Sequence, residues 1–290
     1  MKGIKRRAKA VYHLIKLEDH LDFLIGAIAV AIIANGSLLL PDIGRLIYAL
    51  LFGLFLLGGT IVLNQYFDIE VDRINKPHRP LPSGAIKPRS ALIIVGLCYL
   101  TALFLSFFLG QLYSLIAIIA IFLSFTYSHP YTQIRKRSIL LQVFIINAGY
   151  SVITFLIGWC VYKPVELIPL WFIVFLFITD VGGVIVKDYR DYEGDKKHGY
   201  ITLPTLLGYE KAVLLNSVIY ITPFICLLAL SILNIVDIRF AFLSLYCILT
   251  GSYVFLNMKK GDKKKEIFGY YLITANFMIV RIFSVWALVI

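Results

Sequence analysis

Long apolar segments separated by short polar ones run through the whole chain. Several of the separating segments are only turns, such as Pro41 to Gly44 and Gly110 with Gln111, which favours tight connections between helices. Nine stretches of about 17 to 25 mostly apolar residues, the length that spans a bilayer, are predicted at 21–40, 45–67, 91–109, 112–128, 139–161, 166–186, 212–233, 238–257 and 267–290. The pattern predicts an all-α integral membrane protein with about nine transmembrane helices.

Composition supports one membrane domain and argues against a nucleic-acid-binding protein. Of the 290 residues, 60% are hydrophobic and only 16% are charged, and no hydrophilic block is long enough to fold separately. The formal charge of +11 comes largely from basic residues in short segments between apolar runs, where membrane topology explains them better than nucleic acid does. We therefore expect residues 1–290 to form a single transmembrane domain. The four cysteines lack a CxxC spacing and are expected to be free thiols.

Basic residues are distributed unevenly between the two ends of the predicted spans. Of the 28 Lys and Arg residues, 24 lie in the segments that share one face, which are 1–20, 68–90, 129–138, 187–211 and 258–266. The positive-inside rule places this face in the cytoplasm. We thus predict a multi-pass cell-membrane protein with a cytoplasmic N-terminus and a C-terminus outside. The loops after the second and sixth spans, an even number of crossings apart, then both lie on the cytoplasmic face.

An acidic column is predicted where the second span leaves the membrane. In the segment NQYFDIEVDRINKPHRP, Asn64, Asp68 and Asp72 are four residues apart, so a helix would place them on nearly one face. Carboxylate and amide oxygens are hard donors that suit Mg²⁺, which keeps further positions for water and substrate phosphate. The column is predicted to bind a metal ion together with a diphosphate.

A second acidic cluster follows the sixth span. In KDYRDYEGDKKHGYITLP, Asp188, Asp191 and Asp195 have the helical spacings of three and four residues. Facing the first column, this cluster could hold a second Mg²⁺, so that two ions clamp a diphosphate leaving group. The basic residues that could neutralise diphosphate oxygens are Arg73, Lys76, Arg79 and Lys187. For each residue taken alone, the alternative is a solvated carboxylate at the membrane boundary or a cation that sets topology.

Other polar residues in apolar surroundings have more than one interpretation. Tyr127 and Tyr131 precede a basic cluster, and either ring could shield a carbocation or anchor the chain at the membrane interface. Asn147 in the fifth span is expected to face the bundle interior. Asp180 and Arg281, also within spans, are expected to form structural pairs rather than act in catalysis. The sequence contains no zinc-binding His/Cys pattern and no nucleotide-binding Gly-rich motif.

Together, the two acidic motifs resemble those of the UbiA superfamily of intramembrane prenyltransferases. NQYFDIEVD is similar to the family's NxxxDxxxD pattern and KDYRDYEGD to its second Asp-rich motif, and the resemblance covers nearly the whole chain. It implies a helical bundle around a central cavity with cytoplasmic Asp-rich loops. It also implies Mg²⁺-dependent transfer of a prenyl group from a polyprenyl diphosphate, such as geranylgeranyl diphosphate, to a lipophilic acceptor.

The resemblance also implies roles for particular residues. Those expected to act in catalysis are Asp68, Asp72, Asp191, Asp195 and Tyr127, and the expected metal ligands are Asn64, Asp68, Asp72, Asp188, Asp191 and Asp195. Lys187 and Asp188 precede the second motif as in many members, and Tyr127 with Arg135 and Lys136 approximates a Tyr/Lys segment of the family. The substrate-binding candidates are therefore Asn64, Arg73, Lys76, Arg79, Lys187, Asp188, Arg135, Lys136 and Asn147.

Two departures from the family pattern leave the acceptor open. Glu18, Asp19 and His20 stand where many members have an Arg, and Val184–Ile185 stand where members that make archaeal ether lipids often have Arg-Glu. The candidate acceptors are a glyceryl phosphate ether lipid such as geranylgeranylglyceryl phosphate, an aromatic quinone precursor and a tetrapyrrole. A membrane transporter is the alternative function, since intramembrane acids also mark transport pathways. Here, however, the acids cluster at helix ends rather than at mid-bilayer.

Overall fold

The computed structural model describes residues 2–16, 20–132, 134–258 and 262–290, and within these ranges it is helical, with no β-strand. Eight helical segments are long and apolar enough to cross a membrane: α3 (Ile43–Phe67), α5 (Pro88–Leu109), α6 (Gln111–Ser128), the α7–α8 segment (Ile139–Trp159), α9 (Leu170–Arg190), α12 (Tyr209–Ile232), α13 (Arg239–Asn257) and α14 (Lys263–Val289). The predicted all-α membrane fold is confirmed.

The first predicted span is a shorter helix than the others. α2 (His20–Asn35) has 16 residues, which makes it about 24 Å long, less than the roughly 30 Å of a bilayer's hydrocarbon core. It packs against α8 (Ile153–Trp159) and α14 inside the bundle. The expected nine spans therefore correspond, in the part of the chain that the structure describes, to eight long helices and one short one.

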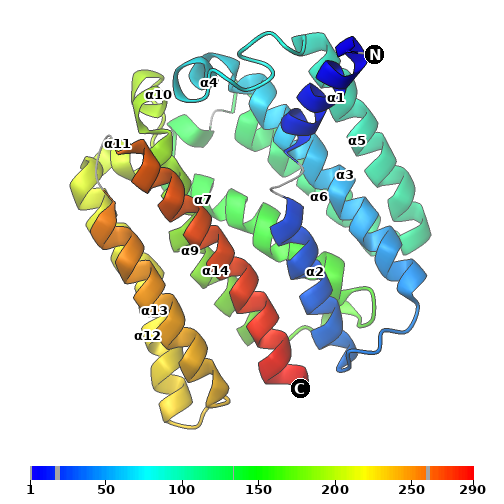
Figure 1. The fold of residues 1–290 in the computed structure, drawn as a ribbon. Helices are drawn as coiled ribbons and strands as arrows, with labels where there is room; N and C mark the ends of the chain where they lie inside the picture. The colour runs from blue at the N-terminus through cyan, green and yellow to red at the C-terminus, as the bar shows by residue number, and fades with distance from the viewer. Residues whose placement is uncertain (1, 17–19, 133, 259–261) are drawn as a thin grey trace.

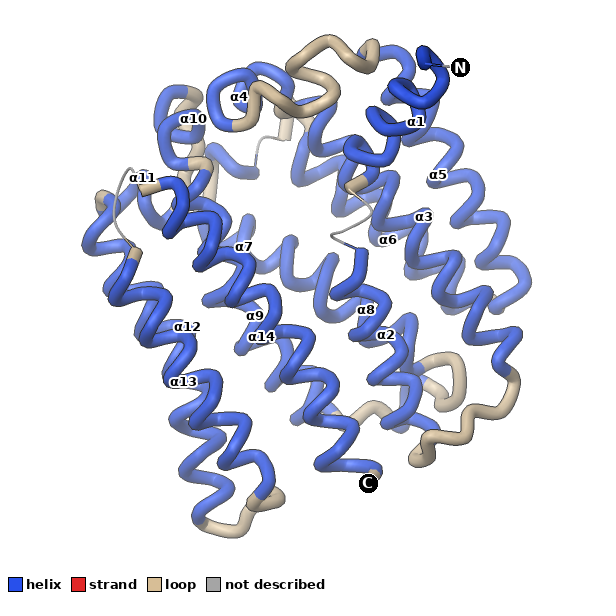
Figure 2. The backbone as a smooth tube through the Cα atoms, in the orientation of Figure 1, coloured by secondary structure: helices blue, strands red, loops and turns tan. Residues whose placement is uncertain are grey.

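Short helices gather at one end of the bundle. Figures 1 and 2 place α1, α4, α10 and α11 at the same end as the N-terminus, whereas the C-terminus lies at the opposite end. The short elements are α1 (Lys2–Ile15), α4 (Ile69–Asn75), the 3₁₀-helix η2 (Ile134–Lys136), α10 (Tyr192–Lys197) and α11 (Leu203–Leu207). This end contains both loops in which the acidic motifs lie.

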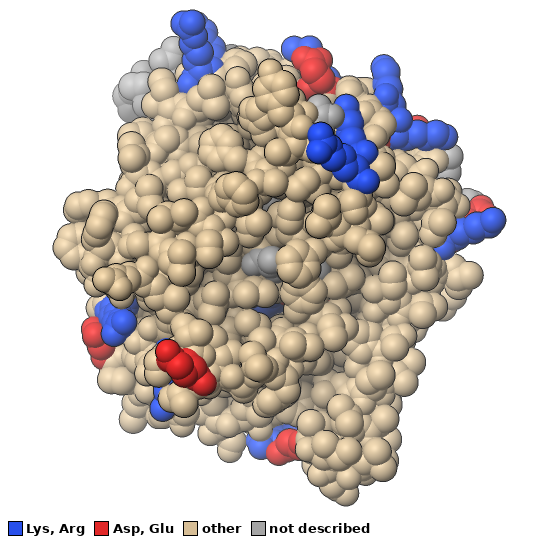
Figure 3. Space-filling view, turned by 180° about the vertical axis from the view of Figure 1, so that it is seen from behind, with Lys and Arg blue, Asp and Glu red and all other residues tan. Residues whose placement is uncertain are grey.

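Apolar side chains cover much of the outside of the molecule. Phe107 and Leu256 are 79% and 85% exposed, a degree of exposure that water would penalise and lipid would not. Figure 3 shows charged side chains near the upper and lower margins of one face, with a wide uncharged band between them. The four cysteines are free thiols, as predicted; three are buried and Cys226 is exposed.

Arg281 of α14 ties three helices together inside the bundle. Its guanidinium nitrogens lie 3.1 Å from Asp22 on α2 and 3.1 Å from Asp180 on α9, and all three side chains are buried. Ser151, in the π-helix η3 (Ala148–Val152) between α7 (Ile139–Asn147) and α8, donates a hydrogen bond to Asp180. Gly26 leaves room for the cation, since a Cβ there would lie 2.9 Å from Arg281 Cδ. The predicted structural pairing of Asp180 and Arg281 is confirmed.

Replacing Arg281 with Met is expected to destabilise the protein by about 3–5 kcal/mol, because two buried carboxylates lose the cation that pairs with them. The matched control is Arg73→Met, since Arg73 pairs with Glu70 at the surface and their side chains are 58% and 66% exposed. This control should lose less than about 1 kcal/mol. Thermal unfolding of the purified proteins in detergent measures both effects. A melting temperature of Arg281→Met equal to that of the wild type would contradict the buried-pair account.

Candidate active site

Asp68 and Asp191 lie at matching breaks in the two halves of the chain. Asp68 separates α3 from α4, and Asp191 separates α9 from α10. Their backbone angles are nearly the same, with φ −92° and ψ 10° at Asp68 and φ −97° and ψ 3° at Asp191. Many active-site residues have this sparsely populated conformation. The expected single helix through each motif is corrected to a long and a short helix that meet at the carboxylate, because the backbone turns there.

Arg135 joins the two acidic motifs. Its Nη1 lies 2.7 Å from Asp68 Oδ2 and its Nη2 lies 3.3 Å from Asp195 Oδ1. The guanidinium also lies 4.1 Å from the ring centroid of Tyr200, whose hydroxyl donates a 3.3 Å hydrogen bond to Asp68. The backbone carbonyl of Arg135 accepts a 2.6 Å hydrogen bond from the N–H of Ile201. The segment after α6 therefore places one cation between the first and the second motif.

Two basic residues in the segment after α4 also form ion pairs with carboxylates of the two motifs. Lys76 Nζ lies 2.5 Å from the carboxylate of Asp191, and Arg79 Nη1 lies 2.6 Å from Asp72 Oδ2. Each of these four side chains is 15% exposed or less. On the other side of Asp191, Arg190 Nε lies 3.9 Å away. The loop of the first motif thus contacts the second motif directly, as the sequence predicts for two loops on one face of the bundle.

Asn75, which the sequence analysis did not select, fixes the first loop to α10. Its Nδ2 donates a 2.9 Å hydrogen bond to the carbonyl of Asp191, and its Oδ1 accepts a 2.9 Å hydrogen bond from the N–H of Gly194. A Cβ at position 194 would lie 2.4 Å from Asn75 Nδ2, so the close approach requires glycine. The carbonyl that Asn75 contacts belongs to a residue 116 positions away, and no local sequence pattern indicates such a partner.

Burial and neighbouring charges move the pKa values of two acids in opposite directions. Burial raises the pKa of Asp195 to about 8, although Arg135 acts to lower it. Burial acts to raise the pKa of Asp191 too, but Lys76 and Arg190 outweigh it and lower that pKa to about 2. Asp191 is therefore a well-compensated anion, whereas Asp195 is short of neighbouring positive charge.

The oxygen atoms of the cluster suit a hard divalent cation. Asp195 Oδ2 is buried and accepts no hydrogen bond from any described residue, so it is a free oxygen donor in a dry setting. Asp188 is 4% exposed and precedes Asp191 by three residues on α9. Among the described residues, no three carboxylate, His or Cys side chains are arranged to hold one metal ion. Lys76, Arg79 and Arg135 pair with Asp191, Asp72 and Asp68, and the predicted set of metal ligands stays a prediction.

Several other predicted residues lie beside this cluster. The guanidinium of Arg135 lies 5.8 Å from the ring centroid of Tyr127, near the end of α6. Asn64 lies one turn before Asp68 on α3, and its carbonyl accepts the hydrogen bond of the Asp68 N–H. Lys187 is partly buried on α9, and Lys136 is exposed.

Two predicted residues, Arg73 and Tyr131, are not brought to the cluster. Arg73 pairs with Glu70 at the surface, with 58% of its side chain exposed. Tyr131 is 86% exposed, which fits a membrane-interface anchor better than a ring that shields a carbocation. The side chain of Asn147 lies outside the part of the chain that the structure describes. Tyr200, which was not predicted, has the position beside Arg135 that an aromatic shield would need.

Gly194→Ala is expected to destabilise the junction between the two loops by about 1–3 kcal/mol, because its Cβ would overlap Asn75. In a protein that already carries Asn75→Ala, the amide that the new Cβ would overlap is absent. Gly194→Ala should therefore lower the free energy of unfolding much less in that protein. Gly96→Ala in α5 is the control, since a Cβ there meets nothing within 4 Å. Thermal unfolding of the four variants measures the coupling. Strictly additive losses would show that the two residues do not contact each other in this way.

Comparison with known proteins places the chain in a family. Residues 23–278 match the model of the UbiA prenyltransferase family. The digeranylgeranylglyceryl phosphate synthase of Methanosphaera stadtmanae is 33% identical over 169 residues, 57% of this chain and 58% of the relative. The homogentisate phytyltransferase of Synechocystis sp. is 32% identical over 186 residues, 61% of this chain and 59% of the relative. The chain thus spans about three fifths of the length of these curated relatives.

Solved structures share the fold over nearly the full length. A digeranylgeranylglyceryl phosphate synthase structure superposes with a TM-score of 0.68 at 27% identity, covering 98% of this chain and 99% of the other. A UbiA homologue from Archaeoglobus fulgidus, bound to GPP and Mg²⁺, superposes with a TM-score of 0.65 at 19% identity, covering 95% and 99%; this likeness concerns the fold. With its helical bundle, its paired acidic motifs and a family match over most of its length, this chain belongs to the UbiA prenyltransferase family.

Proposed function

We propose that this protein is an intramembrane prenyltransferase that moves a polyprenyl group from an allylic diphosphate to a lipophilic acceptor and releases diphosphate. The observation that carries the proposal is the joining of two acidic motifs, from distant parts of the chain, by Arg135 at the end of the membrane helices α3 and α9. Family membership and the names of the relatives support it. The transporter alternative has no support from these comparisons.

The residues of the site divide into metal ligands and diphosphate-binding cations. We assign the metal ions, two in number, to the oxygens of Asn64, Asp68, Asp72, Asp188, Asp191 and Asp195, which all lie at the ends of α3 and α9 or in the short helices after them. When bound, Mg²⁺ neutralises the negative charge that develops on the leaving diphosphate. Lys76, Arg79 and Arg135 are the cations nearest to these carboxylates, and they are placed to contact diphosphate oxygens.

In the proposed reaction, the bond between the first prenyl carbon and the bridging diphosphate oxygen breaks, and diphosphate leaves with the electron pair. The acceptor atom then forms a bond to that carbon and loses its proton. The rings of Tyr127 and Tyr200, whose centroids lie 5.8 Å and 4.1 Å from the Arg135 guanidinium, are the aromatic groups that we assign to stabilising the developing positive charge. The surrounding lipid and helices exclude water, which would otherwise trap the cation as an alcohol.

For the substrates, we propose geranylgeranyl diphosphate as the donor and a glyceryl phosphate lipid, such as geranylgeranylglyceryl phosphate, as the acceptor. Relatives named digeranylgeranylglyceryl phosphate synthase, and a solved structure of such an enzyme that aligns with almost the entire chain, support this choice. An aromatic quinone precursor is the second candidate, because the relative from Synechocystis sp. is a homogentisate phytyltransferase.

For the orientation in the membrane, we propose that the N-terminus and both acidic loops face the cytoplasm and that the C-terminus lies outside. The excess of Lys and Arg on the predicted cytoplasmic segments supports this orientation. The end of the bundle with α1, α4 and α10 is also opposite to the C-terminus (Figure 1).

The direct test is incubation of purified protein in detergent or nanodiscs with labelled geranylgeranyl diphosphate, Mg²⁺ and a panel of acceptors. We expect a prenylated glyceryl phosphate lipid, and we expect its formation to stop in excess EDTA and to return with added Mg²⁺, because the site offers oxygen donors only. Turnover of an aromatic acceptor alone would overturn the acceptor assignment. Full activity in EDTA, or folded protein without transfer to any acceptor, would overturn the proposed function.

Asp68→Ala and Asp191→Ala should each lower turnover on the order of 10²- to 10³-fold, the usual effect of removing a group that stabilises developing charge. Because groups that act as a unit are strongly non-additive, the double variant should be scarcely slower than either single one. Initial rates at saturating substrate measure the effect. Independent, multiplicative losses would mean that the two motifs do not share one diphosphate.

The control for this pair lies at the opposite end of α3. Asp42 caps the helix by accepting a 3.0 Å hydrogen bond from the N–H of Arg45, and its φ is +47°. Asn tolerates this backbone conformation and can still cap a helix. Asp42→Asn is therefore expected to keep both stability and turnover near the wild-type values.

A further inference from the structure

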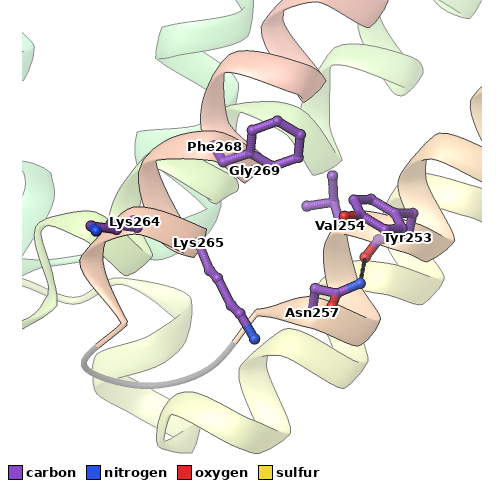
Figure 4. A pocket seen from close by; sticks show the side chains of 7 residues that line it. All are labelled: Tyr253, Val254, Asn257, Lys264, Lys265, Phe268 and Gly269. Atoms are coloured by element: carbon purple, nitrogen blue, oxygen red, sulfur yellow. Dashed lines mark hydrogen bonds between the residues drawn. The ribbon is translucent and has the colours of Figure 1, made fainter.

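A small cleft opens between the end of α13 and the first turns of α14. It has a volume of about 220 Å³ and is lined by Tyr253, Val254, Asn257, Lys264, Lys265, Phe268 and Gly269. Figure 4 shows the Phe268 ring on one side and Tyr253 on the other, while Lys265 extends toward Asn257. The cleft thus combines an apolar aromatic part with a polar, basic part, and its polar part is at the end of the helices.

The cleft faces the outside of the bundle. Tyr253 and Phe268 are 54% and 55% exposed, and the neighbouring Leu256 is 85% exposed. Toward the interior the helices are in close contact, since a Cβ at Gly269 would lie 3.0 Å from Val254 Cγ1. A ligand in the cleft would therefore come from the surrounding bilayer and would be separated from the acidic cluster by packed helix.

The positive charge of the lysines around the cleft is only partly paired with carboxylates, so the cleft favours an anion. Lys263 is already engaged, since it lies 3.1 Å from the buried carboxylate of Glu266. Lys265 has only Asp262 near it, at 4.0 Å, and Lys264 makes no ion pair with any described residue. Both ammonium groups are on exposed side chains at the boundary where α14 enters the bundle.

We propose that this cleft binds the phosphate group of an anionic membrane lipid from the leaflet on the side of the acidic loops. Lys265 would contact the phosphate oxygens, and Lys264, which points away from the cleft in Figure 4, would add positive charge nearby. The rings of Tyr253 and Phe268 would lie along the first part of an acyl or prenyl chain. Basic pockets between helices at this depth are known to suit anionic headgroups. Aromatic side chains with one apolar and one wet end are also typical of this depth.

The residue before the lysines of the cleft contacts the end of α9 near the acidic cluster. Lys263, next to the lysines of the cleft, donates a 3.0 Å hydrogen bond to the carbonyl of Arg190. Arg190 in turn stacks on Tyr270 of α14, 4.3 Å from the ring centroid, and adjoins Asp191.

The test compares binding of phosphatidylglycerol and phosphatidylcholine with identical acyl chains to the full-length protein by native mass spectrometry. The wild type should prefer phosphatidylglycerol. The double variant Lys264→Gln/Lys265→Gln should bind phosphatidylglycerol on the order of 10- to 30-fold more weakly than the wild type does. Each basic side chain near an anionic surface contributes about 1 kcal/mol. Lys265→Gln alone should show part of this loss, and phosphatidylcholine binding should not change.

The control variant is Lys87→Gln with Arg89→Gln, which removes the same charge from exposed positions at the start of α5. It should bind phosphatidylglycerol like the wild type. An equal loss in the control would show general surface attraction and overturn the site, as would equal binding of the two lipids by the wild type. Displacement of the lipid by millimolar inorganic phosphate would show a site for free phosphate instead. Because the readout is lipid binding, the result does not depend on the proposed transferase activity.

Discussion

The sharing of cations between carboxylates is the interaction on which the arrangement of the site depends. Acidic side chains gathered at the end of a membrane bundle repel one another, and burial increases the cost of each charge. Arg135 lies between Asp68 and Asp195, and Lys76 crosses from the first motif to Asp191. These cations hold together two segments that only the fold brings near each other. The aromatic ring of Tyr200 and the amide of Asn75 complete the junction.

Much of the fold can be predicted from the sequence, because few backbone structures are stable in the apolar interior of a bilayer. A spanning segment must satisfy its own backbone hydrogen bonds, so a long apolar run in this setting becomes a helix. The exception is the first span, where hydropathy extends to residue 40 but α2 ends at Asn35. Gly36 has a φ of +72° and ends the helix, and Leu39 beyond it is 86% exposed. The turn begins at Asn35-Gly36-Ser37, and a hydropathy pattern passes over it because three leucines follow.

The acids of the site could also be predicted, but most of their contacts could not. Helical spacing marks Asp68 and Asp191 as members of clusters, yet spacing says nothing about which cation faces them. Arg73 and Arg79 are equivalent in a charge pattern, but the turn between them sends Arg79 to Asp72 and leaves Arg73 at the surface. Asp22 was likewise not predicted as a partner of Arg281, because it lies 259 residues away in the chain.

The ion pairs of the site affect how the binding of a metal ion depends on the binding of a diphosphate. The ion pairs of the site join four acids, Asp68, Asp72, Asp191 and Asp195, to four bases, Lys76, Arg79, Arg135 and Arg190. On the proposed function, the metal ions alone, or a diphosphate alone, would disturb this arrangement, whereas their opposite charges largely offset each other when both are bound. The two proposed binding equilibria would therefore be thermodynamically linked, and each ligand would raise the affinity for the other by the same factor. On the proposed function, the site would favour the metal ions and the diphosphate together over either one alone.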